Sequence, residues 1–453
     1  MRVTNPYNNE VIGEIALSNK EQAFEIIESA KLAKTKMRDL SSFEKATILK
    51  QIVRGIREHF HEFVQTIAQE SGKPMRYAKG EVERAIQTFT VASEECKRLP
   101  HELFDIDGSL PGRNLKGEYV YFPRGIIFGI SPFNFPMNLA VHKIAPAIAT
   151  GCPIILKPSS KTPLTMELLA KVIAGTDLPK GGFSLLHCSR EVGDELVKNT
   201  DIDVLSFTGS PEVGWNMKAM AGKKHVVLEL GGNAAAILAH DAKVEKAVDE
   251  LVIGGFAYAG QVCIHTQRIY VHASIYKEFV EKYVAKAAQL IIGNPINEET
   301  EFGVMIDEKN AERIEKWVNE AIAAGAEKLL GGQRSGALYP PTILTQVPKG
   351  QKVRDEEVFG PVVVIESYDS LENAIAEVND SRWGLQASIY TDSISIRNQV
   401  FQELEVGAVI HNKSTTFRVD NMPYGGIKDS GFGREGVRYA MLDYLEPKLL
   451  IRE

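Results

Sequence analysis

Short apolar runs alternate with stretches of helical spacing through the middle of this 453-residue chain. Strand–helix alternation with short apolar strands predicts a parallel, doubly wound α/β sheet. A second alternating block, from about 234 to 412, predicts a second α/β domain. In the first block the predicted strands are 125–130, 153–157, 183–187, 204–207 and 226–229, and the predicted helices are 138–150, 163–174, 191–198 and 211–221.

The N-terminal part of the chain has a different pattern, in which helices follow a short strand pair. Ser41 and Glu44 have the spacing of a capping box at the start of one helix. Gly72 and Pro74 break the helical pattern, because neither residue is favoured inside a helix. The strand pair is predicted within residues 3–16, and the helices near 19–37, 41–70 and 74–98.

Two later segments are predicted to be extended. Residues 107–124 carry glycine and proline before an aromatic run, and they predict an arm suited to contact another subunit. The chain is rich in glycine from Met422 onward, and residues 439–451 are predicted to be extended and apolar.

Composition and charge narrow the class of protein. A chain of this length exceeds one hydrophobic core, which predicts two or three domains. The net charge of −7 argues against non-specific binding to nucleic acid. No apolar run is long enough to cross a bilayer, and the N-terminus has no apolar signal region, so no membrane association is expected. These features predict a cytoplasmic enzyme.

The cysteines do not form a framework. The four cysteines show no CxxC spacing, which argues against a disulfide scaffold and a structural zinc, and no metal site is expected. A reducing compartment fits this pattern. A single cysteine is most often a small buried hydrophobe. The four are Cys96, Cys152, Cys188 and Cys263.

Cys263 has a different setting from the other three. It follows a glycine turn at Gly260 and precedes a segment with the composition of a strand, 268–272. Glu229 stands before a double glycine, and Asn134 lies between two phenylalanines. A nucleophile, a carboxylate and an amide donor are the groups that acyl chemistry needs.

A second set of residues suits a phosphate or a ribose. Gly209 and Ser210 follow a predicted strand and open a helix whose free N–H groups favour an anion, with Gly214 four residues further on. Lys157 closes another strand, at the edge where open parallel sheets bind ligands, and two hydroxyls follow it, Ser159 and Ser160. The G-x-G-x-x-G fingerprint of dinucleotide sites is absent. An ordinary strand-to-helix turn and a solvated lysine fit the same patterns.

Taken together, these motifs resemble the NAD(P)-dependent aldehyde dehydrogenase superfamily, particularly its lactaldehyde and non-phosphorylating glyceraldehyde-3-phosphate dehydrogenase-type members. The resemblance runs from about Asn5 to the C-terminus. It is carried by Phe133-Asn134-Phe135-Pro136, Leu156-Lys157-Pro158-Ser159, Phe207-Thr208-Gly209-Ser210, Leu228-Glu229-Leu230-Gly231-Gly232, Gly260-Gln261-Val262-Cys263, Glu357-Val358-Phe359-Gly360-Pro361 and Pro423-Tyr424-Gly425-Gly426.

The resemblance implies a fold, an assembly and a cofactor. The expected fold is α/β, with a Rossmann-type cofactor domain, an α/β catalytic domain and a small β arm that assembles a homodimer or homotetramer. NAD or NADP is the expected cofactor. The expected limits are 1–106 and 125–230 for the cofactor domain, 231–412 for the catalytic domain, and 107–124 with 413–453 for the arm and C-terminal segment.

The resemblance also implies roles for single residues. Cys263 would be the nucleophile and Glu229 the general base, while Asn134 and the Cys263 N–H would hold the oxyanion. For the cofactor, Lys157 would bind the adenosine ribose, Gly209 and Ser210 the pyrophosphate, and Glu357 and Phe359 the nicotinamide end.

Several positions depart from the usual pattern of the superfamily. Members that require NAD commonly have a glutamate where this chain has Ser160, which predicts that NADP is tolerated or preferred. A cation at Arg418 and a histidine at His142 replace apolar or aromatic residues of the pocket. Arg84 resembles an arginine that binds substrate phosphate, but Val262 stands where that subgroup has a second arginine. Arg84 as a solvated helix residue and His142 as a core histidine remain alternatives.

The predicted function is NAD(P)+-dependent oxidation of a short hydroxylated or anionic aldehyde to its acid. Lactaldehyde, glyceraldehyde-3-phosphate, sulfolactaldehyde and succinate semialdehyde are candidate substrates. One alternative is a coenzyme A-acylating dehydrogenase, against which Glu229 argues because those relatives typically lack it. A non-catalytic nucleotide-binding structural protein is the other, and the presence of Cys263, Glu229 and Asn134 argues against it.

Overall fold

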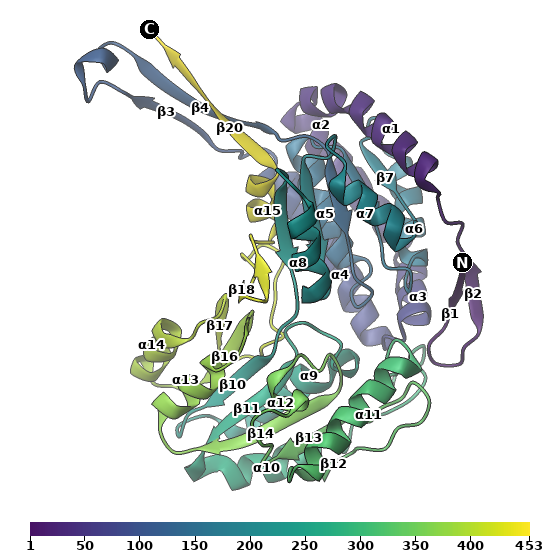
Figure 1. Cartoon of the computed structure of the whole chain (residues 1–453), viewed down its shortest axis with the longest axis vertical. Helices are drawn as coiled ribbons and strands as arrows, with labels where there is room; N and C mark the ends of the chain where they lie inside the picture. Colours follow the sequence, from purple (N-terminus) through teal and green to yellow (C-terminus); the bar gives the residue numbers. More distant parts are fainter.

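The computed structural model describes residues 1–453 as two α/β bodies and a projecting β arm (Figure 1). The first body is built on a six-stranded sheet in the order β19-β9-β8-β5-β6-β7. All neighbouring strands in it are parallel except β19, which pairs with β9 antiparallel. The strands are β5 (Ile127–Ile130), β6 (Ile154–Lys157), β7 (Phe183–Leu185), β8 (Val204–Thr208), β9 (His225–Glu229) and β19 (Gly431–Phe432).

Helices connect these strands as the apolar pattern predicts, and four N-terminal helices add to the same body. The connecting helices are α5 (Asn138–Thr150), α6 (Leu164–Ala174), α7 (Arg190–Lys198) and α8 (Pro211–Met220). The N-terminal helices are α1 (Lys20–Asp39), α2 (Ser42–Glu58), α3 (Phe60–Ser71) and α4 (Met75–Glu95), preceded by the hairpin of β1 (Arg2–Thr4) and β2 (Val11–Glu14).

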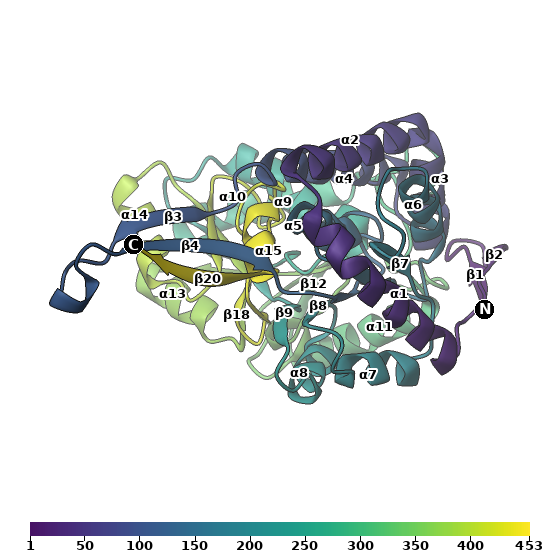
Figure 2. The same ribbon diagram turned by 90° about the horizontal axis from the view of Figure 1, so that it is seen from above.

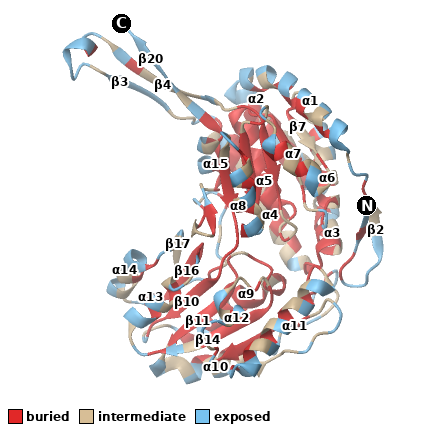
Figure 3. Cartoon of the chain, in the orientation of Figure 1, coloured by how far each residue is buried: buried red, intermediate tan, exposed pale blue.

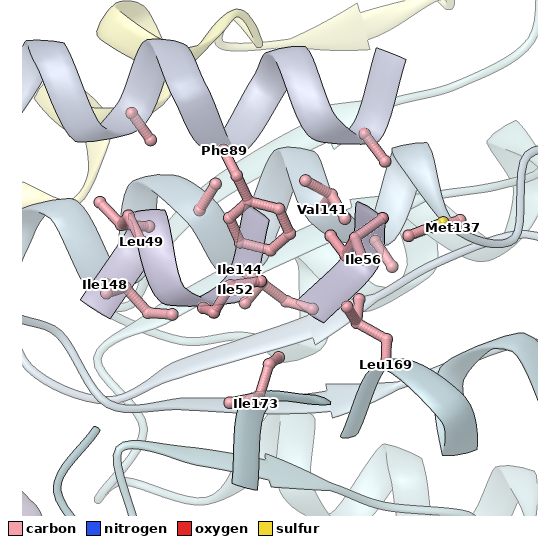
Figure 4. Close-up of a cluster of buried hydrophobic side chains, with 14 of the residues drawn as sticks. Leu49, Ile52, Ile56, Phe89, Met137, Val141, Ile144, Ile148, Leu169 and Ile173 are labelled. Atoms are coloured by element: carbon pink, nitrogen blue, oxygen red, sulfur yellow. The ribbon is translucent and has the colours of Figure 1, made fainter. Parts of the chain in front are cut away.

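The core of this body lies where α2, α4, α5 and α6 meet. Figure 4 shows Phe89 of α4 pointing into the layer formed by Ile52 of α2 and Ile144 of α5. α5 is buried along its whole length, which fits its position at the centre of the body (Figure 3). Because α5 is buried, its N-terminal end is held in place by the surrounding core. The segment just before it, which contains Asn134, is held in place with it.

The second body is a seven-stranded sheet in the order β12-β13-β14-β11-β10-β16-β17, parallel except for β12. Its strands are β10 (Ala234–Leu238), β11 (Thr266–His272), β12 (Glu327–Leu330), β13 (Thr342–Thr345), β14 (Val362–Tyr368), β16 (Gln386–Tyr390) and β17 (Ala408–His411). Its helices are α9 (Val244–Phe256), α10 (Ala273–Ala287), α11 (Glu308–Ala323), α12 (Lys352–Asp355), α13 (Leu371–Asn379) and α14 (Ile394–Glu403).

The arm is a three-stranded antiparallel sheet that projects from the first body (Figures 1 and 2). It consists of β3 (His101–Asp105), β4 (Lys116–Pro123) and the C-terminal β20 (Leu445–Arg452), with β4 in the centre. A short 3-10 turn, Leu110–Gly112, lies between β3 and β4. The small pair β15 (Trp383–Gly384) and β18 (Ile427–Lys428) completes the sheets.

Two predictions of secondary structure were wrong. The helix predicted over 41–70 is two helices, because the chain leaves the helical path at His59 and both α2 and α3 then pack on α4. The predicted capping box of Ser41 and Glu44 is confirmed. The segment 439–451 begins inside helix α15 (Val437–Asp443), whose buried residues have helical spacing and face α5. None of the helices is both long and apolar enough to cross a membrane.

Candidate active site

Cys263 is presented by a tight loop between α9 and β11. The chain passes from α9 into a 3-10 turn, Ala257–Gly260, in which Tyr258 and Ala259 have positive φ angles of 48° and 51°. Gly260 is also left-handed, and a Cβ there would lie 2.2 Å from the carbonyl oxygen of Gly360. The turn therefore needs a glycine at this position.

The thiol of Cys263 is held by a tyrosine. Its Sγ lies 3.1 Å from the Oη of Tyr424, in a hydrogen bond. Burial raises the pKa of the Cys263 thiol to about 12, although the Tyr424 hydrogen bond and the charge of Arg418 act in the opposite direction. The thiol is therefore protonated at neutral pH in this state, and a base must remove its proton before it can attack.

Asn134 lies on the same cavity as Cys263 and is fixed by the nucleophile loop itself. Its Nδ2 donates to the carbonyl oxygen of Gln261 at 2.9 Å, and its side chain is buried. Gln261 in turn accepts from the N–H of Ile306 through its side chain, at 2.9 Å. An amide nitrogen carries two hydrogens, so the second hydrogen of Asn134 remains for a ligand in the cavity.

Glu229 is a buried carboxyl group at the end of β9. It is 2% exposed, and neither of its oxygens has a hydrogen-bond partner. Burial and then the charge of Glu435 raise its pKa well above the usual value, against the opposing effect of Arg418. A Cβ on Gly425 would lie 2.9 Å from its Oε1, so a glycine there leaves room for the carboxyl group. A base that works near neutral pH needs such a raised pKa.

A chain of charges connects this site to the interior. The guanidinium of Arg418 lies 3.7 Å from the centre of the Tyr424 ring and 3.0 Å from the carboxylate of Glu435. Glu435 also pairs with Lys143 at 3.1 Å. Burial tends to raise the pKa of Glu435, but Lys143 and Arg418 together hold it well below the usual value. No role is predicted from the sequence for Tyr424, Lys143 or Glu435, and only Tyr424 lies inside a motif.

A cavity of about 450 Å³ opens beside Cys263 and has the features of a dinucleotide site. The N-terminus of α8 faces it without a side-chain cap, which leaves free N–H groups for an anion. Glu357 accepts from the N–H of Gly232 at 3.0 Å, and burial raises the pKa of its carboxyl group to about 7. The predicted site residues that line this cavity are Asn134, Cys263, Gly209, Ser210, Glu357 and Phe359.

Four predicted cofactor residues do not line that cavity. Lys157 ends β6 and lies beside Gly193 of α7, and the Ser159 hydroxyl accepts from the N–H of Lys161. Ser160 lines a separate cavity of about 770 Å³, next to the N-terminal hairpin. Gly214 allows α8 to pack closely against Leu230, because a Cβ at this position would lie 2.4 Å from the Leu230 side chain.

A cavity of about 660 Å³ lies on the other side of the nucleophile loop, where it is lined by Val262, the residue before Cys263. Arg84 and Arg418 both line this cavity, as do Phe135 and Tyr258. It therefore places two guanidinium groups next to the nucleophile loop, as an anion-binding pocket would require.

Asp420 organises the basic side of this cavity. Its carboxylate accepts from Arg84 at 2.7 Å, from Asn138 at 3.1 Å and lies 2.9 Å from the Nε2 of His142. Burial acts to raise the pKa of Asp420, but the His142 hydrogen bond and Arg84 hold it below its usual value. His142 is buried, does not line the cavity, and has a pKa lowered by burial. His142 is therefore connected to the cavity through its hydrogen bond with Asp420.

The chain matches known proteins over its whole length. Residues 1–450 match the model of the aldehyde dehydrogenase family. A 3-sulfolactaldehyde dehydrogenase of Priestia megaterium is 41% identical over 452 residues, which cover 100% of this chain and 94% of that protein. A lactaldehyde dehydrogenase of Methanocaldococcus jannaschii is 42% identical over 456 residues, which cover 100% of this chain and 97% of that protein.

Solved structures have the same fold. Aldehyde dehydrogenase 21 of Physcomitrella patens, in complex with the reaction product succinate, has a TM-score of 0.99 and 43% identity and covers 100% of this chain and 95% of that one. Glyceraldehyde-3-phosphate dehydrogenase GapN of M. jannaschii, complexed with NADP, has a TM-score of 0.96 and 42% identity, covering 100% and 98%. The predicted fold is confirmed, and the chain belongs to the aldehyde dehydrogenase family of enzymes.

Proposed function

We propose that this enzyme oxidises a short aldehyde with an anionic far end to the carboxylic acid, through a thioester on Cys263. The observation that carries the proposal is the position of the nucleophile loop. Cys263 lines the cavity suited to a dinucleotide, and Val262 lines the cavity that contains Arg84 and Arg418. The loop therefore lies between a cofactor site and a basic substrate pocket.

The reaction starts when Cys263 loses its proton to water, and the thiolate then attacks the aldehyde carbon to form a C–S bond while the carbonyl π electrons move to the oxygen. The second N–H of Asn134 and the N–H of Cys263 stabilise the oxyanion, and loss of one such donor typically costs about 10²–10³ in rate. Bound NAD(P)+ supplies the acceptor for the hydride that the carbon loses, which leaves a thioester.

Glu229 completes the reaction by hydrolysis. Its buried, unpartnered carboxylate takes a proton from water, and the resulting hydroxide attacks the thioester carbon. The C–S bond breaks, the acid leaves, and the proton held by Glu229 passes to the departing sulfur, which restores both the thiol and the carboxylate. Because Glu229 can activate water, it favours water over coenzyme A as the acceptor of the acyl group. The presence of Cys263, Glu229 and Asn134 together argues against a purely structural protein.

The basic pocket supports an anionic substrate. Arg84 remains partly open to solvent, with 29% of its side chain exposed, although it is paired with Asp420. The similar proteins named above act on sulfolactaldehyde or hold succinate, and both molecules carry an anionic group. Lactaldehyde, which is neutral, is the contrasting candidate.

Two further features belong to the proposal. Ser160, in place of a carboxylate, supports use of NADP+ at least as readily as NAD+. The arm of β3, β4 and β20 supports assembly into a homodimer or homotetramer. The limits proposed for the domains are those predicted from the sequence, except that the arm begins at β3, so the first part of the cofactor domain ends at residue 100 instead of 106.

The test is a panel of short aldehydes with NAD+ and NADP+, measured as kcat/KM. The anionic members are sulfolactaldehyde, succinate semialdehyde and glyceraldehyde-3-phosphate, and the neutral members are lactaldehyde and glycolaldehyde. Arg84→Gln should raise KM for the preferred anionic aldehyde by about 10- to 100-fold, the value of a charged hydrogen bond, and leave neutral aldehydes nearly unaffected. Arg38→Gln, an exposed residue of α1, is the control. Equal kcat/KM for neutral and anionic aldehydes would reject the basic pocket.

A further inference from the structure

A buried ammonium group, that of Lys73, lies at the wall of the substrate-side cavity and contacts two aromatic rings. The side chain of Lys73 is fully buried, and its Nζ is 3.9 Å from the ring centre of Phe135 and 4.7 Å from that of Tyr258. Glu81 forms an ion pair with it from the first half of α4. Lys73 stands in the turn between α3 and α4, far in sequence from either ring.

Each ring belongs to a segment that carries a reacting group. Phe135 directly follows Asn134, and Tyr258 is in the strained turn that precedes Cys263. Lys73 therefore contacts the oxyanion donor's segment and the nucleophile's segment at once. No step of the proposed reaction uses this ammonium.

The partners of Lys73 fix the same two segments. The Oε1 of Glu81 accepts from the N–H groups of Met137 and Asn138, at 2.9 and 3.2 Å, and so holds the start of α5. The Oη of Tyr258 donates to the carbonyl oxygen of Ser71 at 2.8 Å, two residues before Lys73. Both segments are tied to the turn at 71–73 by these contacts.

We propose that Lys73 is a positioning residue, whose ammonium, held by Glu81, sets Asn134 and Cys263 at their working separation. The inference rests on the roles proposed above for these two residues. A displacement of about 1 Å in a reacting group is enough to reduce a rate by about 10²-fold, so a rigid element between the two segments has a direct effect on the chemistry.

Stability alone is a weak reason for this ion pair. Replacing a buried ion pair by apolar groups of similar volume is often neutral or stabilising. Burial lowers the pKa of Lys73, and the charge of Glu81 acts in the opposite direction. The ion pair therefore persists despite the cost of removing the two charges from water. Tyr258 and Ala259 also keep left-handed backbones that only surrounding contacts can enforce.

The experiment removes both charges together and measures their effect on Asn134. In Lys73→Met/Glu81→Gln, the glutamine keeps an oxygen for the Met137 and Asn138 N–H groups and no lone charge is buried. The burst rate of NAD(P)H formation should fall at least about tenfold, while the melting temperature and cofactor Kd stay close to wild type. Asn134→Ala should then reduce the burst rate much less in this background than in wild type, since the amide is already misplaced.

Two results would overturn the proposal. One is a folded double variant with the wild-type burst rate. The other is an Asn134→Ala effect of the same size in both backgrounds, which a purely structural role would give. If the double variant does not fold, Phe135→Leu takes its place, because it leaves the ion pair intact and removes only the ring on the Asn134 side; an unchanged Asn134→Ala effect there also rejects the proposal.

Cys263→Ala separates this inference from the proposed function. If Cys263→Ala still turns over aldehyde, the proposed function fails and the positioning role fails with it. If Cys263→Ala is inactive and binds cofactor normally, the proposed function stands, and the Asn134→Ala comparison then decides the role of Lys73 alone.

Discussion

The Oη of Tyr424 lies 3.1 Å from the Sγ of Cys263, and this hydrogen bond is the only one that the thiol makes with another side chain. The guanidinium of Arg418 lies 3.7 Å from the centre of the Tyr424 ring, and its positive charge favours a negative charge on the nearby sulfur. Both groups act to lower the pKa of Cys263 against the effect of burial. The tyrosine therefore favours the reactive thiolate.

Tyr424→Phe should keep the ring and remove only the hydrogen bond to Cys263. A hydrogen bond of this kind contributes about 0.5–1.5 kcal/mol, so alkylation of Cys263 by iodoacetamide at pH 7 should slow by about 2- to 12-fold. The measurement is the alkylation rate between pH 6 and 10, in which the variant's profile should move to higher pH. Tyr121→Phe, in the arm, is the control. An unmoved profile would show that the tyrosine does not influence the thiol.

Glu229→Gln should separate the two halves of the reaction. The thioester still forms but water is no longer activated, so a burst of about one NAD(P)H per active site should be followed by very slow turnover. Rapid mixing with the preferred aldehyde measures both phases. Glu405→Gln, on the exposed surface, is the control. Unchanged steady-state turnover would remove Glu229 from the mechanism.

The same substitution should change how stability depends on pH. The folded-state pKa of Glu229 is raised, so folding favours its protonated form; that contribution is fully present below the unfolded pKa of about 4.5 and is lost as pH rises through the folded value. Glutamine stays neutral throughout. The melting temperature of Glu229→Gln relative to wild type should therefore be higher at pH 8 than at pH 5, and an equal difference at both values would contradict the raised pKa.

The sequence predicted the fold and the position of the nucleophile because both depend on local patterns. Apolar periodicity locates β5, β8 and α5, and a glycine turn marks the loop of Cys263. Local pattern failed at His59, because the break between α2 and α3 is set by packing on α4 rather than by glycine or proline.

The partners of the site residues could not be predicted, because they come from distant parts of the chain. Asp420 joins Arg84 to His142 across 336 and 278 residues. Glu435 and Lys143 meet only when the C-terminal segment folds back on α5. A single sequence identifies residues with reactive chemistry, whereas burial and long-range pairing decide which charges remain free.

Cofactor preference is tested by Ser160→Glu. A carboxylate there should repel the 2′-phosphate of NADP+ and favour the free 2′-hydroxyl of NAD+. The ratio of kcat/KM for NADP+ to that for NAD+ should fall by at least about tenfold, for a loss of 1.4 kcal/mol or more. Ser109→Glu, in the arm, controls for the added charge. An unchanged ratio would mean that Ser160 serves only the cavity beside the N-terminal hairpin.

The arm offers a test of assembly because its two faces differ. Directly paired residues of an antiparallel sheet share a face, and the register places Glu102, Tyr119 and Leu449 in one row and Phe104, Gly117 and Ile451 in another. These rows lie on the same face, since they are two residues apart along each strand. Apart from Glu102, the residues of these two rows are apolar or aromatic, and Leu449 and Ile451 are 47% and 54% exposed.

Leu449→Glu/Ile451→Glu should therefore dissociate the oligomer, because burying two carboxylates in an interface is strongly unfavourable. Light scattering after size-exclusion chromatography should give a mass near that of one 50.1 kDa chain, where wild type gives a multiple of it. Leu450→Glu, whose side chain is on the opposite face, is the matched control and should keep the wild-type mass. Dissociation by Leu450→Glu alone would place the interface on the other face, and a wild-type mass of one chain would show that the arm does not assemble the protein.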